Sequence, residues 1–144
     1  MGMLGIMTGS IGKDSELFEH AKKRIMKTVH GTATLLIARD CVVIPRHGAD
    51  PRRYILPHLI NHQANMTALK DLGVNEIIAV QSTGSLQKTL KPGKFAVPDD
   101  FILLYGGPTV FSAKAEHITP TLDEGIRQRL IQAARDCRIK VVDG

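Results

Sequence analysis

Three short polar segments of the sequence carry groups that could hold a tetrahedral oxyanion. They are residues 8–10 (TGS), 46–48 (RHG) and 81–85 (QSTGS), and each follows an apolar run typical of a β-strand. The first and third offer hydroxyls and open backbone N–H groups, and the Arg46 guanidinium can bind two oxygens at once. Each segment alone is also typical of an ordinary turn or a solvated charged pair. Together, in this order, they predict a phosphate-type site if their strands share one sheet.

The elements that must position these segments alternate between strands and helices. Apolar runs and helical spacings predict, in chain order, a strand at 3–7, a helix from 14, a hairpin of strands at 35–38 and 42–45, a helix from 57, strands at 74–80, 95–97 and 101–105, a helix from 121 and a strand at 139–142. Such alternation is typical of a layered α/β fold, in which ligands bind where loops leave the carboxyl ends of strands.

Each of the three helix starts depends on specific residues. Asp14 stands at an N-cap position ahead of apolar residues that recur at helical spacing as far as Ile25. Pro57 suits the first turn of the second helix. Thr121 and Glu124 have the spacing of a capping box at the start of the third.

The composition limits the classes of function. A chain of 144 residues that is 43% hydrophobic can build one globular domain, here residues 1–144. Its formal net charge of +5 favours an anionic partner, but 4% aromatic residues and no tryptophan argue against a nucleic-acid binder. The sequence shows no secretory leader and no membrane-length apolar run, so we expect a cytoplasmic protein without membrane contact. Cys41 and Cys137 have no metal-ligand spacing and are expected to be buried thiols, so no metal is predicted.

Five sequence blocks in a fixed order carry a family resemblance. They are LGIMTGS at 4–10, IPRHG at 44–48, PHLINHQANMTALKDLGVNEIIA at 57–79, STGSL at 82–86 and KPGKFAVPDDFI at 91–102. With these blocks the chain resembles the purine nucleoside phosphorylase and methylthioadenosine phosphorylase family, in its trimeric branch. The resemblance runs from about residue 3 to the end of the chain, and the block at 57–79 is its most specific part.

The resemblance implies a fold and a reaction. The fold is a layered α/β/α sandwich with a central mixed β-sheet, and we expect this chain to hold its N-terminal portion and to lack the C-terminal part. The family cleaves the N-glycosidic bond of a purine nucleoside with inorganic phosphate, giving the free base and ribose 1-phosphate without a metal or other cofactor. We therefore expect a pentosyltransferase of purine salvage, a homo-oligomer such as a trimer, that acts on 5′-methylthioadenosine or methylthioinosine.

The resemblance also implies roles for particular residues. The positions matching phosphate ligands, or the loop that touches phosphate, are Ser10, Arg46, His47, Gln81 and Ser82. His117 matches a histidine that approaches the 5′ end of the ribose from a neighbouring subunit. The acid or amide that reads the purine is expected beyond Gly144, so no catalytic residue is assigned.

Two other functions stay open. One is a non-catalytic remnant or half-chain that binds phosphate, nucleoside or a partner chain, because the base-side residues are expected beyond Gly144. The other is a small basic nucleic-acid-binding domain, whose contacts would be Lys22, Lys23, Arg24, Arg52 and Arg53. The charges at 22–24 are explained more simply as a solvated face of the predicted helix.

Overall fold

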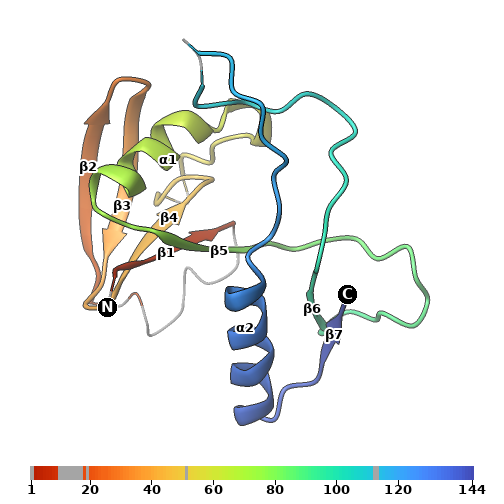
Figure 1. Ribbon diagram of the computed structural model, residues 1–144. Helices are drawn as coiled ribbons and strands as arrows, with labels where there is room; N and C mark the ends of the chain where they lie inside the picture. Colours follow the sequence, from red (N-terminus) through yellow and green to blue (C-terminus); the bar gives the residue numbers. More distant parts are fainter. Residues whose placement is uncertain (1, 10–17, 19, 51, 112–113) are drawn as a thin grey trace. The chain divides into compact units, whose positions relative to one another are not determined.

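The computed structural model describes residues 2–9, 18, 20–50, 52–111 and 114–144 (Figure 1). The chain divides into two compact units, one formed by Met1–Thr83 with Pro108–Val110 and the other by Gly84–Gly107 with Phe111–Gly144. The expectation of a single domain over 1–144 stays a prediction.

The first unit contains a mixed five-stranded sheet. In the order in which they pair, its strands are β2 (Lys22–Thr28), β3 (Gly31–Ile37), β4 (Cys41–Pro45), β1 (Leu4–Thr8) and β5 (Glu76–Val80). β4, β1 and β5 run parallel to one another, whereas β2 pairs antiparallel with β3 and β3 antiparallel with β4. The predicted hairpin of β3 and β4 is therefore confirmed.

The core of this unit lies between the sheet and helix α1 (His62–Asp71), which packs against β2 and β3 (Figure 1). Ala33 and Leu35 are both buried because alternate residues of a strand face the same side. β4 is buried over its whole length, as expected for an apolar strand with a neighbour on each side. From α1, Ala68 and Leu69 complete the core. This packing fixes β4, and with it the start of the segment at Arg46.

The helix predicted from Asp14 to Ile25 is wrong from Lys22 onward, because these residues belong to strand β2. Asp14 itself lies outside the described residues. All seven residues of β2 pair with β3, ending with Thr28 opposite Gly31. Gly31 takes a φ of 116°, which favours glycine, and the Thr28 hydroxyl donates to its carbonyl at 2.8 Å. Pairing with a buried strand thus outweighs the helical spacing, and the basic residues at 22–24 lie exposed on an edge strand, where charge discourages further pairing.

The second predicted helix begins later than its proline suggests. Pro57–Leu59 form a separate 3₁₀ turn, η2, and the N-cap of α1 is Asn61. The Asn61 Oδ1 accepts a hydrogen bond from the Ala64 N–H at 2.9 Å, and its Nδ2 donates to the carbonyl of His30 at 2.7 Å. One side chain therefore caps α1 and ties it to the turn between β2 and β3.

The second unit contains two parallel strands, β6 (Phe95–Val97) and β7 (Val141–Asp143), and helix α2 (Glu124–Asp136), which contacts both. The N-cap of α2 is Asp123, which accepts from the Ile126 N–H at 2.8 Å, so the capping box predicted with Thr121 is wrong. An aspartate one residue before the helix satisfies the same backbone donors. The strand predicted at 101–105 is also wrong, because those residues form no strand.

The two cysteines differ in burial. Cys41, at the start of β4, is buried as predicted, whereas Cys137, just after α2, is exposed, contrary to the prediction. Burial, with the Asp40 carboxylate as a second cause, raises the pKa of the Cys41 thiol. Cys137 follows an amphipathic helix that buries only one of its residues, Ile131, and this explains why helical spacing alone did not predict its exposure.

Candidate functional site

The carboxyl ends of β4, β1 and β5 lie together at one edge of the sheet, where the polar segments follow them. The register aligns the last residues of the three strands, Thr8, Pro45 and Val80. Because the strands are parallel, the residues that come next, Gly9, Arg46 and Gln81, leave the same edge. The sequence prediction that these segments converge is met for these three residues.

Arg46 occupies the middle of this row. Its backbone N–H donates to the carbonyl of Thr8 at 3.0 Å, and its Nη1 donates to Oε1 of Gln81 at 3.2 Å. A guanidinium has five N–H donors, and the described part of the chain supplies no partner for the other four. Nor does Arg46 form an ion pair with any described carboxylate, although the residue is half-buried. A cation in this situation favours an anionic ligand.

Gly9 lets the guanidinium lie against the end of β1. A Cβ at this position would stand 3.2 Å from Nη2 and 3.8 Å from Nε of Arg46. Gly9 is not among the described residues with positive φ, so space and not backbone conformation explains the glycine.

His47 is buried, 8% exposed, and its ring fastens the loop that follows. Its Nδ1 lies 2.9 Å from the carbonyl of Ile55, and its ring stacks on Tyr54 with centroids 4.7 Å apart and an angle of 9° between planes. Because a carbonyl only accepts, Nδ1 must carry the proton of this bond. The N–H of Ile55 donates to the carbonyl of His47 at 3.0 Å, which closes the loop a second time.

This geometry bears on the predicted role of His47 as a phosphate ligand. In the neutral ring with its proton on Nδ1, Nε2 is an acceptor and cannot donate to a phosphate oxygen. The backbone N–H of His47, in contrast, has no acceptor within the described residues. The main chain beside Arg46 therefore offers an open donor, the kind of group that lines anion sites.

The structure shows less of the remaining predicted site residues, Ser10, Ser82 and His117. Ser82 directly follows Gln81 and is exposed. Ser10 lies outside the described residues. His117 is exposed and belongs to the second unit. The structure thus brings together Arg46, His47 and Gln81 of the predicted set.

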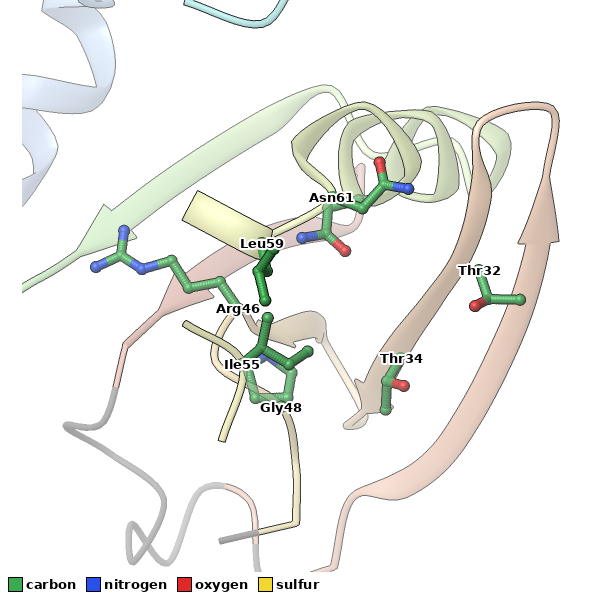
Figure 2. A pocket seen from close by; sticks show the side chains of 9 residues that line it. Thr32, Thr34, Arg46, Gly48, Ile55, Leu59 and Asn61 are labelled. Atoms are coloured by element: carbon green, nitrogen blue, oxygen red, sulfur yellow. The ribbon is translucent and has the colours of Figure 1, made fainter. Parts of the chain in front are cut away.

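A cavity of about 180 Å³ lies beside Arg46. Figure 2 shows the side chains that line it, and the Arg46 guanidinium points away from Thr32 and Thr34. Its lining comes from β3, the end of β4, the segment before α1 and the start of α1: Thr32, Thr34, Pro45, Arg46, Gly48, Ile55, Leu59, Asn61 and Asn65. Sequence reasoning missed this cavity, and it missed the close approach at Gly9. The only sequence signal for the close approach was Gly9 itself. The cavity had no such signal, since a contact between β3 and α1 has no local pattern.

The described residues contain no group of three or more His, Cys, Asp and Glu side chains that could hold a metal ion. Among the same residues, no helix is both long and apolar enough to cross a bilayer. Both findings concern only the part of the chain that the structure describes.

Comparisons with known proteins give consistent results. The family model of the phosphorylase superfamily matches residues 5–144. A probable 6-oxopurine nucleoside phosphorylase of Archaeoglobus fulgidus is 34% identical over 92% of this chain and 56% of its own length. A probable S-methyl-5′-thioinosine phosphorylase of Methanocaldococcus jannaschii is 44% identical over 69% of this chain and 39% of its own.

Solved structures agree with these sequence matches. Methylthioadenosine phosphorylase from Schistosoma mansoni, in complex with tubercidin, superposes with a TM-score of 0.81 and 36% identity, covering 97% of this chain and 55% of that one. The phosphorylase-like α/β fold expected from the sequence is confirmed. The chain spans about half the length of the relatives it matches.

Proposed function

The chain belongs to the phosphorylase superfamily, and we propose that it acts in the phosphate-dependent cleavage of a purine nucleoside, with its own site binding the phosphate. The observation that supports this most is the half-buried Arg46, whose remaining N–H donors have no partner among the described residues and which forms no ion pair with a described carboxylate. A phosphate would supply the missing anion and accept a two-pronged contact from the guanidinium.

The other groups of the row would complete the phosphate site. Gln81 steadies the guanidinium through Nη1, and Gly9 leaves the space in which it lies. We propose that His47 contributes its backbone N–H while its ring holds the loop. Ser10 and Ser82 are the hydroxyl donors proposed to flank the anion.

In the proposed reaction the phosphate is itself the nucleophile. One of its oxygens bonds to C1′ of the ribose as the bond from C1′ to the purine nitrogen breaks, and the base leaves with that electron pair and takes up a proton. The bond loosens toward an oxocarbenium-like state, which the adjacent phosphate charge stabilises. The residues described here would hold and orient the anion, so neither an activated serine nor a cofactor is proposed.

The names of relatives support a narrower substrate class. Proteins named for methylthioinosine and methylthioadenosine cleavage are 44% and 36% identical to this chain over their matches. We propose 5′-methylthioadenosine or methylthioinosine as the substrate, a cytoplasmic homo-oligomer as the working form, and His117 as the 5′-side contact supplied to a neighbouring subunit.

The proposal is tested by titrating the purified chain with phosphate and measuring the binding by isothermal titration calorimetry. We expect Arg46→Ala to weaken phosphate binding at least tenfold, since charge-assisted hydrogen bonds are lost. Arg46→Lys should recover only part of it, because an ammonium lacks the planar fork. Arg39→Ala is the matched control, since Arg39 is exposed beyond the opposite end of β4. Equal affinity in all three variants would remove the central claim.

Release of free purine from methylthioadenosine, methylthioinosine and inosine, with and without phosphate, tests the reaction itself. Phosphate-dependent release supports an active chain. Phosphate binding without release supports the non-catalytic alternative, for which the observation is that the chain spans about half of its relatives.

A further inference from the structure

The cavity beside β3 is lined by a buried amide that has no hydrogen-bond partner among the described residues. Asn65, on α1, is only 8% exposed and lines this cavity. Its side chain makes no hydrogen bond with any described residue. Among the described residues, every fully enclosed polar side-chain atom has a partner, so the unpaired amide atoms of Asn65 are not fully enclosed. The amide atoms are therefore accessible, on a residue that lines the cavity. Buried amides are nearly always hydrogen-bonded, so the partner is expected to come from outside the chain.

Two hydroxyls extend the same lining. Thr32 and Thr34 are alternate residues of β3, so their side chains lie on one face of the strand, and both line the cavity (Figure 2). Neither hydroxyl has a hydrogen-bond partner among the described residues. Asn61, in contrast, is already engaged at both ends of its amide. The cavity thus presents one amide and two hydroxyls, each able both to donate and to accept.

The cavity is also separate from the charged end of Arg46. In Figure 2 the guanidinium points away from Thr32 and Thr34, in agreement with its bond to Gln81. The other lining side chains carry no charge, and Ile55 and Leu59 supply an apolar wall. An ionic ligand would find no countercharge here, whereas an uncharged one could pack on this wall.

Size narrows the ligand further. A cavity of about 150 Å³ in another protein holds benzene, and this cavity is slightly larger, at about 180 Å³. We propose that it is a second ligand site, separate from the phosphate site, for an uncharged single ring that carries an amide edge. The Asn65 amide would pair with adjacent N–H and C=O groups of the ring, the two-point contact by which such side chains read base edges. Thr34 would contact a further polar atom.

The test uses 2-pyridone, a six-membered ring with adjacent N–H and C=O groups. The purified chain, labelled with ¹⁵N, is titrated while the side-chain NH₂ signals of Asn65 are followed; these signals are identified by their loss in Asn65→Leu. We expect saturable shifts, and at least tenfold weaker binding of N-methyl-2-pyridone, which lacks the donor. Saturable binding of both rings with equal affinity would overturn the proposed recognition of the amide edge. No binding of either ring would overturn the ligand site itself and leave a cavity filled by water.

Substitutions of the lining residues test the same hydrogen bonds to 2-pyridone. Asn65→Leu and, independently, Thr34→Val should each weaken 2-pyridone about tenfold, since each removes hydrogen-bonding groups at similar volume. Thr67→Val is the matched control, because Thr67 lies on α1 but does not line the cavity. Inorganic phosphate should leave the affinity for 2-pyridone unchanged. Competition between the two would contradict a separate site, whatever the outcome for phosphate binding itself.

Discussion

A methyl group at Gly9 is the smallest change that disturbs the Arg46 guanidinium without touching its charge. The Cβ of Gly9→Ala would lie 3.2 Å from Nη2, tighter than the ordinary contact range of 3.4–4 Å. The guanidinium must therefore withdraw by a few tenths of an ångström. Because Gly9 is absent from the described positive-φ residues, alanine adds no backbone strain to complicate the result.

The expected magnitude follows from the bond that would be disturbed. Nη1 of Arg46 already lies 3.2 Å from Gln81, at the long end of good N–H···O geometry, so a further shift breaks it or misaligns the fork. Losing one charge-assisted hydrogen bond to phosphate costs roughly 1.5–3 kcal/mol, which weakens binding by about 10- to 150-fold. The free energy of unfolding should change by less than about 1 kcal/mol, since no core side chain is removed.

Phosphate titration by calorimetry, with urea unfolding of the same samples, measures both quantities. Gly106→Ala is the control, because a Cβ there would meet nothing within 4 Å. Unchanged phosphate affinity in Gly9→Ala would refute the reasoning, since it would mean that the guanidinium does not depend on this space. A loss that accompanies global unfolding would be recognised from the urea curve and would equally count against a local effect.

Three further predictions concern single side chains. His47→Phe keeps an aromatic ring to stack on Tyr54 but loses the Nδ1 donor, so urea unfolding should show that the free energy of unfolding falls by about 1 kcal/mol. His47→Ala should lower it further, and equal losses would mean that ring packing is unimportant. Iodoacetamide should modify Cys137 faster than Cys41, because burial raises the pKa of the Cys41 thiol, and mass spectrometry of timed samples would expose the opposite order. The side-chain hydrogen bond from Gln128 is the largest cause that holds the pKa of Glu124 below its ordinary value. The ionised Glu124 carboxylate therefore stabilises α2 fully above its pKa in the unfolded chain, and this stability is lost as pH falls through its pKa in the folded chain. Helicity measured by circular dichroism from about pH 7 to about pH 3 should thus fall less in Glu124→Gln than in the wild type. Parallel curves would count against this role.

The part of the site that could be predicted from sequence is the part set by strand ends. β1, β4 and β5 are short apolar runs, and each is followed by a polar segment. Strands of this kind in an α/β fold run parallel and bring their carboxyl ends together, which is why the sequence predicts that the segments carrying Arg46 and Gln81 converge. The hydrogen bond between these two side chains is a finding of the structure. The order of the motifs along the chain carried this information.

The rest depended on contacts without a local signature. β2 has helical spacing of its apolar residues, but its partner β3 determines its conformation. The ring of His47 is oriented by the carbonyl of Ile55, eight residues away across a loop whose path spacing does not define. The cavity at Asn65 needs β3 and α1 in contact, and that packing is tertiary. Local patterns give elements and their ends, whereas these features arise only when elements meet.

The two units of the chain predict that phosphate binding and nucleoside binding respond to different substitutions. Gly9, Arg46, His47 and Gln81 all belong to the first unit, whereas His117 belongs to the second. The residues proposed to contact phosphate are positioned by strand pairing and by the burial of β4, so the proposed site needs only the first unit to be folded. A change at His117 should therefore alter the KM for a nucleoside and leave the phosphate affinity as it is. If His117→Ala weakened phosphate as much as Arg46→Ala does, the phosphate site could not be the property of the parallel strand ends alone.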